Sequence, residues 1–90
     1  MPKIQVIILN ELGLHARTAT RLVECANHFE CKVWLSHENR RVDGKSIMGL
    51  LTLAAGPGMK LEIETLGSDA NLALVALSDL IASGFAETGA

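Results

Sequence analysis

The segment KLEIETLG, residues 60–67, decides the fold, because apolar and charged side chains alternate along it without interruption. The two sets occupy opposite faces, Leu61, Ile63 and Thr65 on one and Glu62 and Glu64 on the other. A period of two residues is typical of a half-buried strand with one face on the core and one in water. A sheet that contains this strand therefore carries its helices on one face and leaves the other face open.

The segments on both sides of this strand predict helices. Before it, Ser46 precedes the short apolar run IMGLLTLA (47–54), a pattern that predicts a short helix with Ser46 as its N-cap. Pro57, which lies between two glycines, ends that helix before the strand begins. After the strand, Ser68 or Asp69 caps a last helix of about sixteen residues.

The first half of the chain contains one more helix and three more strands. KIQVIILN (3–10) is β-branched and apolar and predicts a strand, and the period becomes helical from Ala16 to about Asn27. CKVWLS (31–36) and RRVDG (40–44) predict a hairpin, because only a short polar turn separates them. The order βαββαβα with such short links predicts an α+β open-faced sandwich whose sheet is antiparallel or mixed.

The bulk composition limits the classes of function. Ninety residues, of which 49% are hydrophobic and 20% charged, predict a single domain over residues 1–90. Eight Lys and Arg against ten Asp and Glu offer no basic surface for nucleic acid. Because no apolar run is long enough for a membrane span or a secretory signal, we expect a cytoplasmic protein without membrane insertion. Cys25 and Cys31 match no zinc or redox spacing, so we expect reduced thiols.

His15 is the candidate reactive residue, because it stands where the first helix begins. A helix start has unpaired backbone N–H groups and the positive end of the helix dipole, and both stabilise an anion. Histidine is a poor N-cap, so we expect it to serve a purpose other than capping. Arg17 lies in the first turn, where a cation is unfavourable unless an anion binds there.

These features predict a phosphoryl acceptor at His15. A neutral imidazole nitrogen is a competent nucleophile, and the helix start with Arg17 would hold the phosphoryl oxygens. A surface histidine that happens to precede a helix is the slightly better interpretation of these residues alone. A metal site built from His15, His28, Cys25 or Cys31 is disfavoured, because no two of them have ligand spacing and no cysteine or acidic cluster is present.

Two sequence motifs favour the phosphoryl acceptor over the surface histidine. GLHAR (13–17) and VDGKSIMGLLTLAAGPG (42–58) resemble the histidine-containing phosphocarrier family, HPr, of the bacterial phosphotransferase system, including its nitrogen-related form NPr. The resemblance covers essentially the whole chain. It implies a four-stranded antiparallel sheet with three helices on one face. It also implies that His15 accepts a phosphoryl group on Nδ1 from enzyme I and donates it to enzyme IIA domains.

The resemblance also assigns the roles around His15. Arg17 matches the family's phosphate-assisting arginine, and the backbone amides of Ala16 and Arg17 would bind phosphoryl oxygens. The protein would be a carrier without turnover of its own, a monomer, and would need no cofactor or metal. The family commonly has proline directly after this arginine, where this chain has Thr18. We expect Thr18 to make the helix start slightly less rigid without removing a phosphate ligand.

Ser46 has two interpretations, which are compatible. As an N-cap it is structurally sufficient. In the resembling family this serine is also a regulatory site, phosphorylated in some bacteria by HPr kinase/phosphorylase. A phosphate there would act on docking, because its charge would repel an acidic partner surface.

The residues after Ser46 predict a docking surface. A short helix buries one stripe, for which Leu50 and Leu53 are the better candidates. The docking surface would then consist of the apolar residues Ile47, Met48 and Leu51 with the polar rim residues Thr20 and Arg21, although these apolar residues could also belong to the core. A second interpretation of the protein is a regulatory docking module of the same fold, whose phosphorylation state is the signal.

Overall fold

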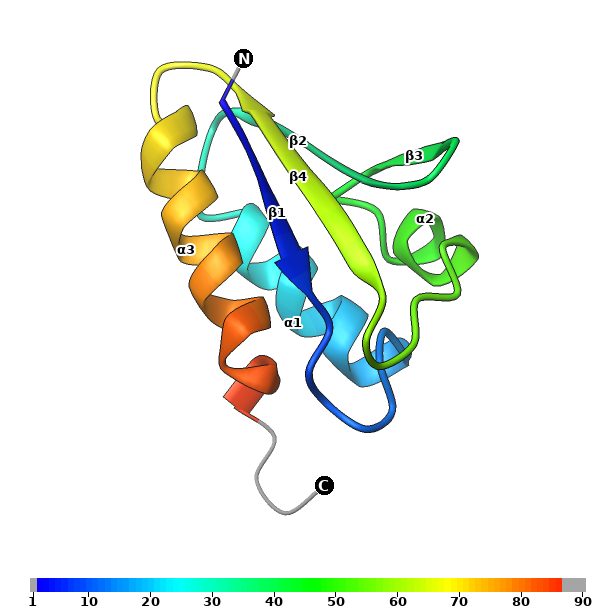
Figure 1. Cartoon of the computed structure of the whole chain (residues 1–90). Helices are drawn as coiled ribbons and strands as arrows, with labels where there is room; N and C mark the ends of the chain where they lie inside the picture. Colours follow the sequence, from blue (N-terminus) through cyan, green and yellow to red (C-terminus); the bar gives the residue numbers. More distant parts are fainter. Residues whose placement is uncertain (1, 87–90) are drawn as a thin grey trace.

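The computed structural model describes residues 2–86 and has the predicted order of elements (Figure 1). In chain order the elements are β1 (Lys3–Ile7), α1 (Ala16–Ala26), β2 (Lys32–His37), β3 (Arg40–Asp43), α2 (Ile47–Thr52), β4 (Lys60–Leu66), α3 (Ala70–Ala82) and a 3₁₀ turn, η1 (Gly84–Ala86). Helix α3 has 13 residues, fewer than expected, because the chain turns away after Ala82.

The four strands form one sheet in the order β1-β4-β2-β3, and every neighbouring pair is antiparallel. This confirms the antiparallel alternative and excludes the mixed one. Ile63 of β4 stands opposite both Ile4 of β1 and Leu35 of β2, so the strand with the clean alternation lies in the middle of the sheet. The register places Val6 of β1 opposite Leu61 and Leu35 of β2 opposite Ile63, so these side chains lie on the same face of the sheet.

The core lies between the sheet and the three helices. Figure 1 shows α1 and α3 crossing one face of the sheet, with α2 next to the β2–β3 hairpin. The sheet side of the core consists of Val6, Ile8, Val33, Leu35, Leu61 and Ile63, all of them buried. Helix α1 buries the residues of one face with helical spacing, which are Thr18, Ala19, Leu22, Val23 and Ala26. Each large apolar side chain that becomes buried contributes roughly 1.5–3 kcal/mol to folding.

The other face of the sheet is open and charged. Glu62 and Glu64 lie on it as predicted, while Leu61, Ile63 and Thr65 are buried. Arg41 of β3 stacks on Trp34, 4.4 Å from its ring centroid, and its Nε lies 3.7 Å from Glu64. Arg41 of β3 thus contacts both Trp34 of β2 and Glu64 of β4 on this face.

The turn after α3 closes the core in a way that the sequence did not reveal. Phe85 is fully buried although its φ of 60° lies in the left-handed region. Arg21 of α1 donates a 2.5 Å hydrogen bond from Nη1 to the Phe85 carbonyl oxygen. This bond connects the end of the described chain to the helix that follows His15.

Two further expectations concern cysteines and membranes. Cys31 is buried, Cys25 is half-buried, and both are free thiols, as predicted. Burial raises the pKa of each thiol, which keeps it protonated. Among residues 2–86, the longest helices fall short of the length and apolarity that a membrane crossing requires.

Candidate phosphoryl-accepting site

His15 is the N-cap of α1, and its side chain closes the helix start. Its backbone is extended, with φ −119° and ψ −177°. The Nδ1 atom accepts a hydrogen bond of 3.3 Å from the backbone amide of Arg17, and the ring also accepts from the amide of Thr18. His15 therefore caps the helix, and its expected purpose beyond capping remains a prediction. An accepting Nδ1 carries no proton, so the neutral ring holds its proton on Nε2.

Thr18 completes this arrangement from the other side. Its Oγ1 accepts a hydrogen bond of 3.0 Å from the His15 amide and lies 2.9 Å from the Gly13 carbonyl oxygen, to which it donates. The two residues thus form a reciprocal capping box, which satisfies amides at the helix start that would otherwise be unpaired. We had expected Thr18 only to loosen the helix start; instead its hydroxyl is a buried bridge between backbone groups.

The loop before His15 is fixed by hydrogen bonds of its own. The side chain of Asn10 donates from Nδ2 to the Gly13 carbonyl oxygen at 2.9 Å, and the Gly13 amide donates back to the Asn10 carbonyl oxygen at 3.2 Å. Asn10 is buried, so these bonds are protected from water. Asn10 was missed in the sequence analysis, since an asparagine between a strand and a glycine indicates a turn without revealing what that turn supports.

This loop rests on the segment that follows α2. Leu14 donates from its amide to the Ala55 carbonyl oxygen at 2.8 Å. Gly13 has a φ of +65°, and a Cβ atom there would overlap the Ala55 carbonyl oxygen. Glycine is required at this position for both reasons. The two motifs recognised in the sequence therefore meet in the structure, one lying on the other.

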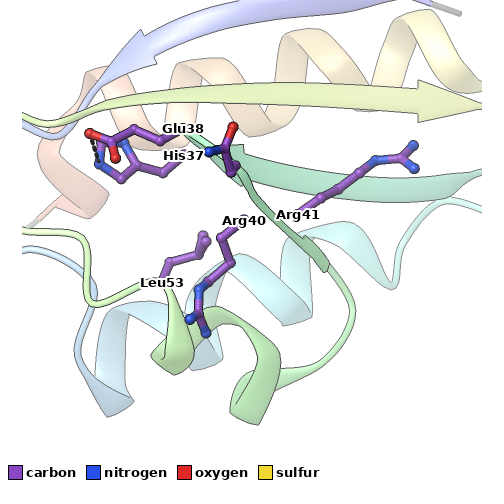
Figure 2. Close-up of a pocket in the computed structure, with 6 residues that line it drawn as sticks. His37, Glu38, Arg40, Arg41 and Leu53 are labelled. Atoms are coloured by element: carbon purple, nitrogen blue, oxygen red, sulfur yellow. Dashed lines mark ion pairs between the residues drawn. The ribbon is translucent and has the colours of Figure 1, made fainter.

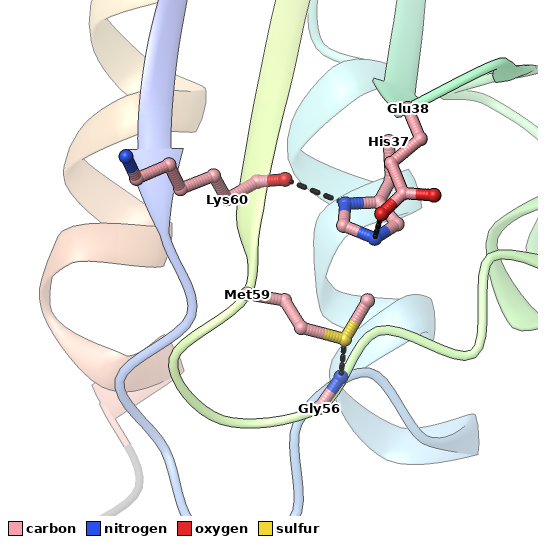
Figure 3. A network of polar contacts seen from close by, with 5 residues as sticks. All are labelled: His37, Glu38, Gly56, Met59 and Lys60. Atoms are coloured by element: carbon pink, nitrogen blue, oxygen red, sulfur yellow. Dashed lines mark hydrogen bonds and ion pairs between the residues drawn. The ribbon is translucent and has the colours of Figure 1, made fainter.

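The supporting segment is itself held by a methionine. Figure 3 shows the sulfur atom of Met59 accepting from the Gly56 amide, at 2.9 Å. Ile8 and Met59 are also linked by a backbone bond of 3.0 Å from the Ile8 amide. The surface under His15 is thus connected both to β1 and to the start of β4.

The other predicted residues of α1 lie around the same helix start. Ala16 and Arg17 are exposed, and the Arg17 amide points at the His15 ring. Thr20 is half-buried, and its hydroxyl donates to the Ala16 carbonyl oxygen at 2.7 Å. Arg21 donates to the Phe85 carbonyl oxygen, which gives it a structural role that its place on an exposed helix face does not reveal.

Helix α2 has the predicted cap and the predicted orientation. Ser46 is its N-cap, and its Oγ accepts from the Gly49 amide at 3.1 Å. Ile47 and Met48 are exposed, Met48 to 72%, whereas Leu51 is half-buried against the core. Leu50 and Leu53 are buried, as their spacing indicated. Helices α1 and α2 pack against each other, which brings the helix that His15 caps next to the helix that Ser46 caps.

A second polar region, on the β2–β3 hairpin, does not form a comparable site. His37, Glu38, Arg40, Arg41 and Leu53 line a hollow there, and Figure 2 shows the side chains of Arg40 and Arg41 pointing in different directions. His37 donates a hydrogen bond of 2.9 Å from Nδ1 to the Lys60 carbonyl oxygen, and its Nε2 lies 3.6 Å from the Glu38 carboxylate. Two guanidinium groups that do not converge cannot grip one anion. Within residues 2–86, no three His, Cys, Asp or Glu side chains are grouped to hold a metal ion.

Comparisons with known proteins agree with this geometry. The family model described as "PTS HPr component phosphorylation site" matches residues 2–83. The Phosphocarrier protein HPr of Neisseria meningitidis is 46% identical over 87 residues, which cover 97% of this chain and 98% of that protein. An HPr structure from Thermoanaerobacter tengcongensis has a TM-score of 0.93 at 38% identity, covering 97% and 98% of the two chains. Another structure from that organism, described as an HPr dimer, has a TM-score of 0.77 at 38% identity, covering 97% and 100%.

A match over nearly the whole chain, in both sequence and structure, includes the motif around His15 and the segment that supports it. The chain belongs to the HPr family, the phosphocarrier proteins of the phosphotransferase system.

Proposed function

We propose that His15 is the residue that carries the phosphoryl group and that Nδ1 is the atom that accepts it. The observation that carries this proposal is the orientation of the ring. Nδ1 faces the amides of the first helical turn, so a phosphoryl group there would lie at the positive end of the helix. Nε2 is shielded from solvent and is therefore poorly placed to meet a donor.

The transfer is a displacement at phosphorus. The electron pair of Nδ1 forms the new N–P bond while the bond from phosphorus to the donor breaks, and the donor atom keeps that pair. The ring then carries its Nε2 proton and a positive charge, which the phosphoryl oxygens offset. Donation to the next acceptor reverses these changes, so the protein ends each cycle as it began and acts as a carrier without turnover of its own.

The exposed groups around Nδ1 would hold the phosphoryl oxygens. The amides of Ala16 and Arg17 lie in the first turn of α1, and the Arg17 amide, which now donates to Nδ1, would donate to a phosphoryl oxygen instead. Arg17 is exposed, and its side chain is long enough to bring the guanidinium group to the same oxygens. No metal or other cofactor is part of this proposal.

The partners that we propose are enzyme I as donor and enzyme IIA domains as acceptors. Ile47 and Met48 would provide the apolar part of the docking surface, with Leu51 beneath them and Thr20 and Arg21 at the rim. Two features support this: α2 packs against α1, the helix that His15 caps, and exposed methionine suits a surface that must fit several partners. We further propose that the chain is one HPr-like domain over residues 1–90, that it is monomeric and that it acts in the cytoplasm.

Ser46 is the proposed regulatory phosphorylation site, with HPr kinase/phosphorylase as its enzyme. It lies at the start of α2, directly before the exposed Ile47 and Met48. A regulatory docking module, read out through its phosphorylation state, is the second candidate function, because the same surface would serve it.

The test is incubation with enzyme I and phosphoenolpyruvate. We expect one acid-labile, base-stable phosphate per chain, and none on His15→Ala. His28→Ala is the matched control, because His28 is an exposed histidine whose ring contacts the Glu24 carbonyl oxygen at the far end of the same helix. Label that persists on His15→Ala, or that is lost from His28→Ala, contradicts the assignment.

A further inference from the structure

The hydroxyl of Thr18 contacts three backbone groups, which belong to Gly13 and His15. It accepts from the His15 amide at 3.0 Å and lies 2.9 Å from the Gly13 carbonyl oxygen and 3.3 Å from the His15 carbonyl oxygen. A hydroxyl has one proton, so it donates mainly to the nearer oxygen, that of Gly13. Thr18 is fully buried, so water does not compete for these bonds.

The backbone amide of Thr18 acts on the same histidine from the other direction, because it donates to the His15 side chain. One residue therefore holds both the main chain and the ring of His15. The carbonyl of Gly13 is held in addition by Asn10 Nδ2, at 2.9 Å. The orientation of the His15 ring thus rests on the amides of Arg17 and Thr18, and of these two residues Thr18 also holds the His15 main chain through its hydroxyl.

We propose that Thr18 is a positioning residue for phosphoryl transfer, because its hydroxyl and its amide together hold the Nδ1 atom of His15 in its accepting orientation. This inference rests on the function proposed above. Thr18 does not touch the phosphoryl group; it acts through His15. A donor that must approach Nδ1 along one line finds the ring already oriented, which lowers the cost of reaching the reactive geometry.

The arrangement differs in kind from one with proline at this position. Proline has neither a hydroxyl nor an amide N–H, so it can make none of these bonds, although it fixes its own φ. This chain therefore achieves order at the helix start through hydrogen bonds that converge on the reactive residue. Because both contributions of Thr18 are lost in Thr18→Pro, that substitution is expected to slow transfer here.

The test compares variants that separate positioning from stability. Thr18→Val keeps the shape and the amide but removes the hydroxyl, and Thr18→Ser restores the hydroxyl. Thr65→Val is the matched control, because Thr65 is equally buried and its hydroxyl also donates to a backbone carbonyl, that of Ala70, at 2.9 Å. Thr65 lies on β4 and Ala70 is the first residue of α3, so this bond lies outside the His15 loop.

Two measurements are made on each variant. The first is the tautomer of the neutral His15 ring, from its ¹⁵N chemical shifts; Thr18→Val should lower the ratio of the Nε2–H form to the Nδ1–H form about three- to tenfold. The second is transfer from phosphorylated enzyme I; Thr18→Val should lower kcat about tenfold with KM unchanged. Thr18→Ser should resemble the unmodified chain in both measurements, and so should Thr65→Val.

The inference is overturned when Thr18→Val behaves as Thr65→Val does, or when only one of the two measurements changes. If Thr18→Val does not fold, Thr18→Ala removes the same hydroxyl without a buried methyl in its place, and the same two measurements decide. If the unmodified chain takes up no phosphate, the proposed function fails on its own, and the tautomer ratio alone decides the role of Thr18.

Discussion

The carboxylate of Asp69 accepts a hydrogen bond of 2.9 Å from the backbone amide of Cys31, 38 residues away in the sequence. Its second oxygen accepts from the amide of Glu30, also at 2.9 Å. Asp69 is at the N-cap position of α3 but makes no side-chain bond to that helix. It instead joins the start of α3 to the turn that leads into β2.

This link makes the stability of the protein depend on pH in the acidic range. The hydrogen bond from the Glu30 amide, followed by those from Cys31, holds the pKa of Asp69 below its usual value. Because this pKa is lowered, Asp69 contributes fully to the free energy of unfolding above the pKa that its carboxyl group has in the unfolded chain. The contribution is lost as the pH falls through the pKa of the folded protein. We expect Asp69→Asn to be less stable at neutral pH and to lose part of the acid dependence.

Urea unfolding at several pH values measures this effect. Asp79→Asn is the control, since Asp79 is an exposed aspartate on the same helix. Equal slopes of stability against pH for Asp69→Asn and the unmodified chain would show that the carboxylate has no such role.

Gly13→Ala should displace the loop that carries His15. Its Cβ would overlap the Ala55 carbonyl oxygen, and φ at this position is +65°. A left-handed backbone alone costs a residue with a side chain roughly 1–2 kcal/mol, so we expect a loss of stability larger than that. Thermal unfolding measures the loss, and Gly58→Ala is the control, because Gly58 also has a positive φ but has open space around its Cβ position. Equal losses in the two variants would rule out a contribution from the contact with Ala55.

Met48→Asp should weaken docking without weakening the fold. Met48 is 72% exposed, and an exposed substitution of this kind changes stability by only about 0.5 kcal/mol. We expect KM for transfer from enzyme I to rise several-fold, with little change in kcat. Leu72→Asp is the control, because Leu72 is 69% exposed on α3. A similar rise in KM for Leu72→Asp would mean that the effect comes from added charge and not from the surface around α2.

Ser46→Asp should mimic the effect of a phosphate on docking. Aspartate is a good N-cap, so it can accept from the Gly49 amide as Ser46 does, and α2 should remain intact. The added negative charge should slow transfer from enzyme I, and more so at low salt. A loss of transfer together with a loss of helix content would instead indicate unfolding. Ser46→Asn can cap the helix without adding charge, so it distinguishes an effect of charge from an effect of unfolding. Unchanged kinetics at low salt would show that charge at this helix start does not control docking.

The alternation along β4 predicted the open sandwich, and the 3.6-residue period predicted α1, because both patterns record directly which side chains face the core. Neither pattern contains the order of the strands. The order β1-β4-β2-β3 follows from how the helices cross the sheet, which depends on contacts between distant segments. Sequence reasoning limited the pairing to antiparallel or mixed for this reason.

In the candidate site, too, local features could be predicted from the sequence and contacts formed on folding could not. His15, Arg17 and Ser46 could be named from the sequence, because their chemistry and their places at helix starts are local properties. Asn10 and Thr18 could not, since a threonine in a first turn and an asparagine in a turn have many uses, and only the folded loop shows which amides and carbonyls they reach. Phe85 was missed because its burial depends on a left-handed turn that no periodicity records.

The pairing of β1 with β4 has a consequence for the order of events during synthesis. Lys3 stands opposite Glu64, and Leu14 needs the carbonyl of Ala55, so the first strand and the His15 loop gain these partners only when more than half of the chain is present. Contacts between distant segments form late, because closing long loops costs entropy before they bring any gain. A nascent chain would therefore display His15 on the ribosome well before it can receive a phosphate, and phosphorylation competence would mark the completion of folding.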